Sequence, residues 1–192
     1  MSHVSTGYAI SKRGTILLTL VILTLLVLNA SLVIQNRNLR ELTTPTKRSI
    51  VLKEGSIVPA LSGLDLNGTR ISLNYQDDPR KAVMLVFSPR CAYCTQNLPN
   101  WHSIAQSLDP KLYRIMAVST SADGVKEYVG QNSFPEVPII ADVDPKSRVS
   151  YEMNLTPQTI LIDSQGRVEK IWTGVLQPDE RTEVERFLGL KL

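Results

Sequence analysis

The sequence is poor in the residues that cross-link small domains or bind metals in them, because its 192 residues include only two cysteines and two histidines. Two cysteines cannot make the several disulfides that hold small secreted scaffolds together. A closed zinc site takes four cysteine or histidine ligands, and His3 lies beyond a predicted membrane span. The cysteines, Cys91 and Cys94, form one C-x-x-C motif. Two interpretations of this motif remain: redox chemistry, or an unusual metal site completed by carboxylates.

Most of the chain also lacks an excess of positive charge. Residues 51–192 hold 15 basic and 17 acidic residues and so carry −2, whereas the first 50 residues carry +5, which gives the net charge of +3. A basic surface that binds nucleic acid is therefore not expected on the folded part. Internal repeats and low-complexity tracts are missing as well, which favours one domain with appendages.

Residues 16–34 contain no charged side chain and are flanked by Lys12, Arg13 and Arg37. As a helix, this stretch is about 28 Å long, close to the thickness of the hydrocarbon core of a bilayer. It predicts a transmembrane anchor. The alternative is a signal peptide cleaved after Ala30, which would place the bulky Leu28 where a small residue is preferred.

The anchor divides the chain into four predicted parts. Residues 1–15 are predicted to be a short cytoplasmic N-terminus, and residues 16–34 the membrane anchor. Residues 35–50 are polar and basic and are predicted to be a linker, while residues 51–192 form the folded domain outside the cytoplasm.

Residues 51–192 read as a single α/β domain. Two strands within 59–73 are predicted to form a β-hairpin with a two-residue turn at Asn67-Gly68. The apolar run 82–87 predicts a strand covered on both faces. Further elements follow from periodicity and turn residues: a helix after the cysteine motif, strands at 112–118, 137–141, 159–162 and 168–172, and helices at 122–131 and from Pro178 onward.

The position of the C-x-x-C motif indicates how the two thiols differ. A strand ends at Phe87, and Cys91 falls where the next helix begins. Unpaired N–H groups at a helix start favour a thiolate, so a lowered pKa makes Cys91 the expected attacking thiol. Arg90 would add to this effect if its side chain turned toward the sulfur. Tyr93 is expected to be partly exposed and to contact the partner.

Cys94 lies one turn further along the helix and is the expected resolving thiol. It begins a stripe at helical spacing that should face the core, formed by Cys94, Leu98, Trp101, Ala105 and Leu108. An exposed Cys91 and a shielded Cys94 suit a cycle between a dithiol and a Cys91–Cys94 disulfide. The alternative is a pair of inert buried thiols or a purely structural disulfide.

The chain resembles the membrane-anchored thioredoxin-like proteins of the TlpA/ResA type, which include the cytochrome c maturation thioredoxins. The resemblance covers roughly residues 55 to 190. It rests on the hairpin 63–68, the strand-to-motif junction 86–94, Leu98-Pro99, the stretch 155–163 and Gly166.

The resemblance implies a thioredoxin-like fold, with a central mixed sheet flanked by helices, an N-terminal β-hairpin and one transmembrane helix before it. It implies a thiol–disulfide oxidoreductase in the bacterial cytoplasmic membrane with its domain on the periplasmic side. Its expected partners are disulfide-containing proteins and an upstream membrane electron donor, without a cofactor. It further implies a cis peptide before Pro157, with Thr156 backbone groups pairing with the substrate.

Three positions depart from the family pattern. Arg90 stands where Trp is usual, Ala92-Tyr93 lacks the common Pro, and Asn97 replaces a Glu proposed to move protons. Two other functions stay open. A thiol peroxidase shares the fold, and Ser88 fits its pattern but Met84 stands where Pro is wanted. A non-catalytic metal- or haem-delivery module could use the same thiols as ligands.

Overall fold

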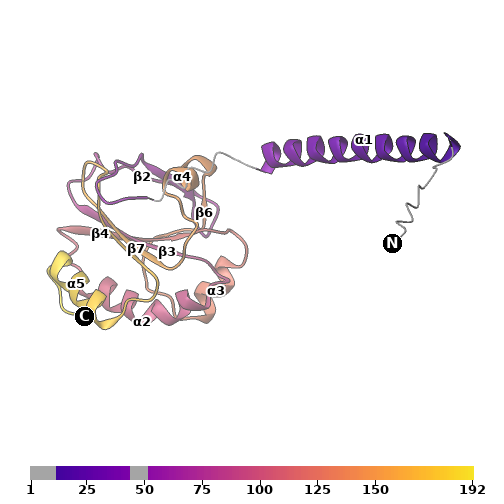
Figure 1. Ribbon diagram of the computed structural model, residues 1–192. Coiled ribbons are helices and arrows are strands. Elements are labelled where there is room, and N and C mark those ends of the chain that lie inside the picture. Colours follow the sequence, from indigo (N-terminus) through magenta and orange to yellow (C-terminus); the bar gives the residue numbers. More distant parts are fainter. Residues whose placement is uncertain (1–11, 44–51) are drawn as a thin grey trace, which may run out of the picture. The chain divides into compact units, whose positions relative to one another are not determined.

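The computed structural model describes residues 12–43 and 52–192, which belong to two separate units (Figure 1). The first unit contains helix α1 (Lys12–Thr43). Within it, the 19 residues Thr15–Val33 are long and apolar enough to cross a membrane, a property that N-terminal signal sequences share. The helix continues to Thr43, into the predicted linker 35–50. Residues 1–11 of the predicted N-terminus 1–15 and residues 44–50 of the predicted linker lie outside the described residues.

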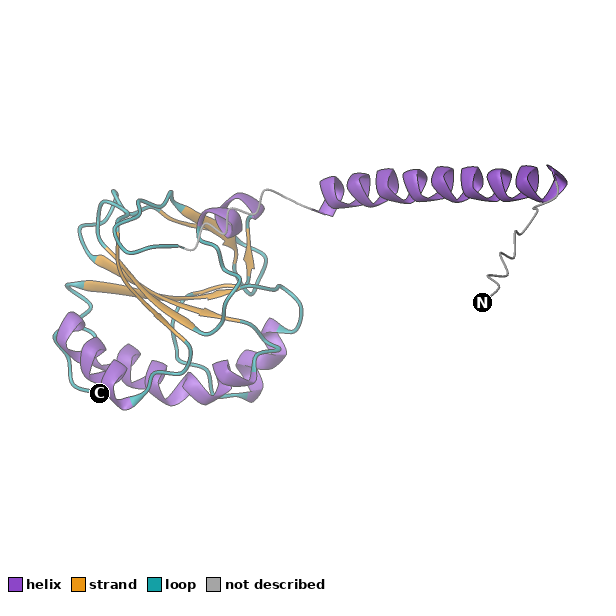
Figure 2. Ribbon diagram, in the orientation of Figure 1, coloured by secondary structure: helices purple, strands orange, loops and turns teal. Residues whose placement is uncertain are grey.

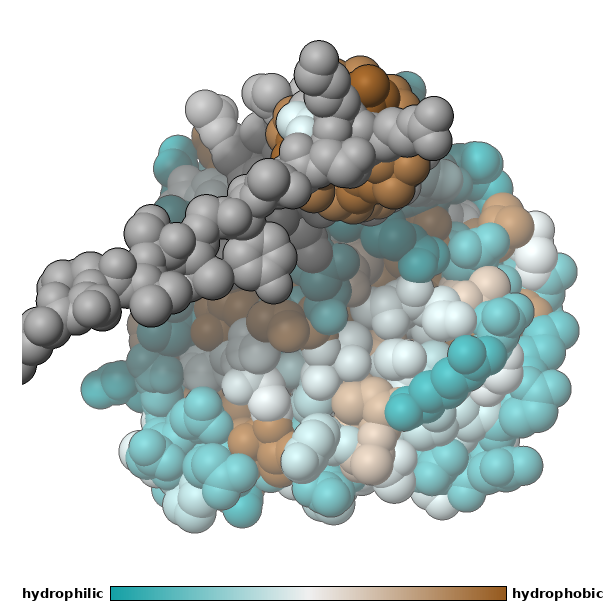
Figure 3. Space-filling view, turned by 45° about the vertical axis from the view of Figure 1, so that its right-hand side comes forward, coloured by the Kyte–Doolittle hydropathy of each residue, from teal (hydrophilic) through white to brown (hydrophobic). Residues whose placement is uncertain are grey.

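The surface of α1 differs from that of the folded domain. The side chains of Leu17 and Leu23, for example, are more than half exposed. The helix is largely brown in Figure 3, whereas the surface of the domain is largely teal and white. Two polar side chains in the apolar stretch bond to the helix itself: Thr24 donates to the carbonyl of Leu20 and Asn29 to that of Leu25. Such internal bonds allow polar residues to sit in an apolar helix.

The domain is built on a five-stranded mixed sheet with the strand order β5-β4-β3-β7-β8 (Figure 2). Strands β3 (Lys81–Phe87), β4 (Tyr113–Ser119) and β5 (Ile139–Ile140) run parallel to one another. Strands β7 (Gln158–Ile162) and β8 (Val168–Thr173) are antiparallel to their neighbours. The predicted mixed sheet is confirmed.

Both faces of this sheet are covered, as the apolar run of β3 predicts. Helices α2 (Ala92–Ser107), α3 (Val125–Gln131) and α5 (Pro178–Leu188) lie along one face (Figure 1). The other face is covered by helix α4 (Pro145–Ser150) and by a small sheet with the order β2 (Arg70–Leu73), β1 (Leu61–Leu64), β6 (Asp142–Val143). Alternate residues of β3 therefore belong to two cores, with Leu85 in one and Met84 in the other.

The small sheet corrects the predicted hairpin turn. Strands β1 (Leu61–Leu64) and β2 (Arg70–Leu73) pair as expected, but residues 65–69 connect them instead of two residues. The carboxylate of Asp65 accepts the N–H groups of Asn67 and Thr69 and so closes the wider loop. Only Gly68 of the Asn-Gly pair has a positive φ, of 81°, whereas the predicted turn needs two.

Several short elements differ from the sequence-based expectation. The predicted helix 122–131 begins only at Val125, after Gly124 in the left-handed conformation. Strand β6 (Asp142–Val143) and helix α4 were not predicted. Both are too short to show periodicity in the sequence.

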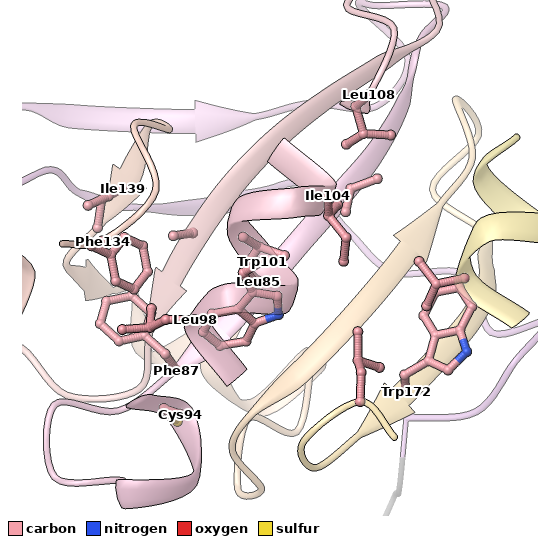
Figure 4. Packing of buried hydrophobic residues seen from close by; sticks show 14 of the residues in the cluster. Leu85, Phe87, Cys94, Leu98, Trp101, Ile104, Leu108, Phe134, Ile139 and Trp172 are labelled. Carbon is pink, nitrogen blue, oxygen red and sulfur yellow. The ribbon is translucent and has the colours of Figure 1, made fainter. Parts of the chain in front are cut away.

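The buried face of α2 is close to the predicted stripe (Figure 4). Cys94, Leu98, Trp101 and Leu108 are buried as expected. The remaining position is wrong, because Ile104 is fully buried and its neighbour Ala105 is only partly so. The 3.6-residue repeat leaves either residue able to face the core, and the larger apolar side chain takes the buried position.

Candidate active site

Cys91 lies at the point where β3 has ended and α2 begins. Its own N–H donates to the carbonyl of Ser88 at 3.1 Å, which closes the turn after the strand. It is the N-cap of α2, and its sulfur accepts the N–H of Cys94 at 3.2 Å. The thiol thus takes the place that an oxygen side chain holds at most helix starts, in the region where a negative charge is favoured.

Cys94 has a different environment one turn further along α2. Its side chain is fully buried, whereas Cys91 is only partly buried, and the two thiols are not bonded to each other. Burial raises the pKa of the Cys94 thiol well above its usual range. One sulfur is therefore accessible to a substrate, and the other is held back as a neutral thiol.

The third component comes from a distant part of the chain. Thr156 is joined to Pro157 by a cis peptide bond, as the family resemblance implied. The carbonyl oxygen of Thr156 lies 3.5 Å from the Cys91 sulfur, within reach of a hydrogen bond from the thiol. The carbonyl of Pro157 accepts the N–H of Gly174 at 2.8 Å, so the segment after β8 supports this loop.

Tyr93 and Arg90, the remaining predicted site residues, are both exposed at the surface. Tyr93 is 64% exposed, as expected, and Leu155, which comes just before Thr156, is 56% exposed. The guanidinium of Arg90 lies 3.9 Å from the carboxylate of Asp123, and both side chains are largely exposed. Arg90 is therefore paired with a carboxylate.

A pocket of about 490 Å³ opens beside Cys91, between the start of α2 and α3. Its lining includes Thr95, Glu127 and Tyr128. The hydroxyl groups of Thr95 and Tyr128 are 3.2 Å apart, and burial raises the pKa of Tyr128. The sequence does not predict that residues 124–132 line this pocket, because nothing local to them indicates that they pack beside the cysteine motif.

Asn97 is a further residue whose position only the structure reveals. The sequence identifies Asn97 as a departure from a family Glu, but it does not predict that the side chain is buried. Its side chain is fully buried, and its oxygen accepts the N–H of Leu176 at 3.0 Å.

Within 12–43 and 52–192, no group of three or more His, Cys, Asp or Glu side chains is placed to hold a metal ion. His102 is partly exposed and bonds to the carbonyl of Ser133 instead.

Two curated proteins are similar to this chain. The thiol-disulfide oxidoreductase ResA of Bacillus subtilis is 28% identical over 127 residues, which cover 65% of this chain and 70% of the relative. A thioredoxin-like protein of Haemophilus influenzae is 25% identical over 116 residues, or 58% of this chain. The match spans 65% of the Haemophilus protein, just under two thirds of its length.

Solved structures agree with the fold. The thioredoxin domain of a thiol-disulfide oxidoreductase from Bacteroides vulgatus superposes with a TM-score of 0.55 at 22% identity, over 71% of this chain and 99% of that one. A thiol:disulfide interchange protein from a Bacteroides species gives 0.54 at 21% identity, over 72% and 91%. The domain thus has the thioredoxin-like fold that the resemblance implied.

The family model described as the AhpC/TSA family matches residues 55–171, more than half of the chain. The matched stretch contains Cys91, Cys94, Thr156 and Pro157. This thioredoxin-fold chain belongs to the AhpC/TSA family.

Proposed function

We propose that this thioredoxin-fold thiol–disulfide oxidoreductase is tethered to the bacterial cytoplasmic membrane and reduces disulfides of proteins on the periplasmic side. The observation that supports this most directly is the unequal burial of its two thiols. Cys91 is accessible at a helix start, and Cys94 is fully buried one turn away. This arrangement suits attack by the first thiol and resolution by the second.

The reaction begins with the Cys91 thiolate and a disulfide of the substrate protein. The thiolate attacks one sulfur, the substrate disulfide breaks, and the departing substrate cysteine takes up a proton. A mixed disulfide now joins Cys91 to the substrate. Cys94 then gives up its proton and attacks the Cys91 sulfur, which releases the second substrate cysteine and closes the Cys91–Cys94 disulfide. Two electrons have passed to the substrate.

The high pKa of Cys94 gives these steps their order. A neutral, buried thiol does not compete for the substrate disulfide, so the accessible Cys91 attacks first. The oxidised enzyme must then be reduced by a second dithiol. We assign this role to an upstream membrane electron donor.

Substrate recognition uses the backbone beside Cys91. An extended substrate segment pairs with the backbone of Thr156 next to Pro157, as an added strand would. Tyr93 packs against the same segment, which its exposed position supports. Arg90 stabilises the Cys91 thiolate in the sequence-based hypothesis, and its pairing with Asp123 weakens that effect.

The membrane tether is the α1 helix. Its apolar stretch of 19 residues, Thr15–Val33, has the length and composition of a span. Residues 35–50 would hold the domain near the membrane. Cytochrome c maturation is the setting that the TlpA/ResA resemblance suggests for the substrate.

A trapping experiment tests the chemistry. The full-length Cys94→Ser protein in membranes should accumulate a mixed disulfide with a protein partner, because Cys91 can attack but no second thiol can resolve the adduct. Cys91→Ser should accumulate none. If no adduct forms and the reduced wild type leaves a model disulfide untouched, the proposal fails. Consumption of hydrogen peroxide in place of disulfide reduction would favour a thiol peroxidase.

The tether has its own test. The intact mass of the membrane-bound protein should match a chain that keeps residues 16–34. A species that begins at Ser31 would replace the anchor with a cleaved signal peptide.

A further inference from the structure

Two amide side chains on α2, those of Asn97 and Asn100, form hydrogen bonds with the backbone of Leu176. The side-chain oxygen of Asn97 accepts the N–H of Leu176 at 3.0 Å, and the amide nitrogen of Asn100 donates to the carbonyl of Leu176 at 3.2 Å. Asn100 also donates to the oxygen of Asn97 at 2.8 Å. Both backbone polar groups of Leu176 are thus held by a helix that begins beside Cys91.

The oxygen of Asn97 is the atom that makes these contacts. Two N–H donors face it, whereas the buried amide nitrogen of the same side chain has no hydrogen-bond partner among the described residues. Leaving a buried donor unpaired is costly. The oxygen compensates by satisfying the backbone N–H of Leu176, which would otherwise also be buried without an acceptor.

The segment that contains Leu176 also contacts the loop that reaches the Cys91 sulfur. Two residues before Leu176, the N–H of Gly174 donates to the carbonyl of Pro157 at 2.8 Å. The preceding carbonyl, that of Thr156, lies 3.5 Å from the Cys91 sulfur. The contacts therefore form a closed loop from the start of α2, through Asn97, Leu176, Gly174 and Pro157, back to Cys91.

We propose that Asn97 and Asn100 are positioning residues, which hold the Thr156–Pro157 backbone beside Cys91 in the geometry that a polypeptide substrate needs. This inference rests on the proposed function, in which the substrate backbone pairs with Thr156. A loop held only by its own backbone would sample several positions relative to the sulfur. The side chains of Asn97 and Asn100, together called the amide clamp, tie this loop to the same helix that presents Cys91. The attacking sulfur and the backbone that binds the substrate therefore keep one relative position.

The clamp predicts a difference between two classes of substrate. A peptide with an internal disulfide must pair with Thr156, whereas the small aromatic disulfide of thionitrobenzoate meets Cys91 without that pairing. In the full-length protein in detergent, Asn97→Leu should lower the rate constant for the peptide about tenfold. The rate constant for the aromatic disulfide should stay within about twofold, because the Cys91 sulfur itself is unchanged.

Two further variants separate positioning from general stability. Asn97→Asp keeps the oxygen that accepts from Leu176 and should restore the peptide rate to within about threefold of wild type. Ser147→Ala also removes a buried side-chain acceptor, that of the Ser62 N–H, but in α4 on the other face of the sheet. It should leave both rates within about twofold.

The outcomes decide the proposal. Equal loss for the two substrates, an unchanged peptide rate, or no recovery in Asn97→Asp would overturn it. If Asn97→Leu does not fold, Asn100→Ala replaces it and should lower the ratio of peptide to aromatic rate at least about threefold; an unchanged ratio would overturn the clamp. A wild-type protein that reduces neither substrate would instead refute the proposed function.

Discussion

The sulfur of Cys91 lies 3.5 Å from the carbonyl oxygen of Thr156, a residue 65 positions later in the chain. The same sulfur accepts the backbone N–H of Cys94 at 3.2 Å. The thiol can donate to the carbonyl oxygen, and its sulfur accepts from the N–H group. The Cys91 sulfur therefore contacts two backbone groups, of which only the N–H of Cys94 is close in sequence.

The two thiols should differ sharply toward alkylation. At pH 7 iodoacetamide should modify Cys91 at least about tenfold faster than Cys94, because Cys94 is buried and its raised pKa keeps it protonated. The difference should shrink as pH rises and the Cys94 thiolate forms. Mass spectrometry of Cys91→Ser and Cys94→Ser gives the two rates separately. Equal rates at pH 7 would contradict the structure.

The close approach of β1 to β6 makes Gly63 sensitive to substitution. A Cβ at this position would lie 2.4 Å from the carbonyl oxygen of Asp142 and 2.5 Å from the side chain of Ile140. Gly63→Ala should therefore lower the free energy of unfolding by about 2 kcal/mol or more, measured by urea denaturation.

Gly130 is the matched control for Gly63. It lies within α3, and a Cβ there would meet nothing within 4 Å. Gly130→Ala should raise the free energy of unfolding by about 0.5 to 1 kcal/mol, because alanine has less backbone freedom to lose in a helix. A similar loss in both variants would argue against the pairing of β1 with β6.

A buried hydrogen bond ties α2 to the sheet behind the motif. The indole N–H of Trp101 donates to the hydroxyl of Thr159 at 2.9 Å, and both side chains are almost fully buried. Thr159→Val keeps the shape but leaves the indole N–H unpaired, which should cost about 1–3 kcal/mol of stability. Thr159→Ser keeps the acceptor and should lose less than Val in the same chemical denaturation. A smaller loss in Val than in Ser would be inconsistent with this bond.

Glu183 should make part of the stability depend on pH. The indole N–H of Trp172 and the ammonium of Lys170 hold the pKa of Glu183 below its usual range. A lowered folded-state pKa adds stability above the ordinary glutamate pKa, and this stability is lost as the pH falls through the folded-state value. Glu183→Gln should be less stable than wild type by about 0.5–1 kcal/mol at pH 7.

The pH series supplies the control for Glu183. As the pH falls through the lowered folded-state pKa of Glu183, the difference between wild type and Glu183→Gln should shrink, because the protonated carboxyl is then uncharged like the amide. Chemical denaturation at pH 7, 5 and 3.5 measures it. A difference that stays constant over this range would show that charge is not its cause.

Much of the fold could be predicted because its signals are local. The apolar run of β3 and the Pro178 start of α5 each lie within a few residues of the element that they define. The same holds for the position of Cys91 at the start of α2. Short elements such as β6 could not be predicted, because two residues form a strand only when a partner strand is beside them. The choice of Ile104 over Ala105 for the core likewise depends on what packs against α2.

The order of residues along the chain is enough to place the two thiols, three residues apart, at a helix start that follows a buried strand. The groups that surround these thiols depend on how the chain folds. The carbonyl of Thr156 and the backbone of Leu176 reach α2 through hydrogen bonds between residues 65 and 79 positions apart. Such bonds leave no periodic trace in the chain, because they form only when the sheet places β7 and the segment after β8 beside the helix.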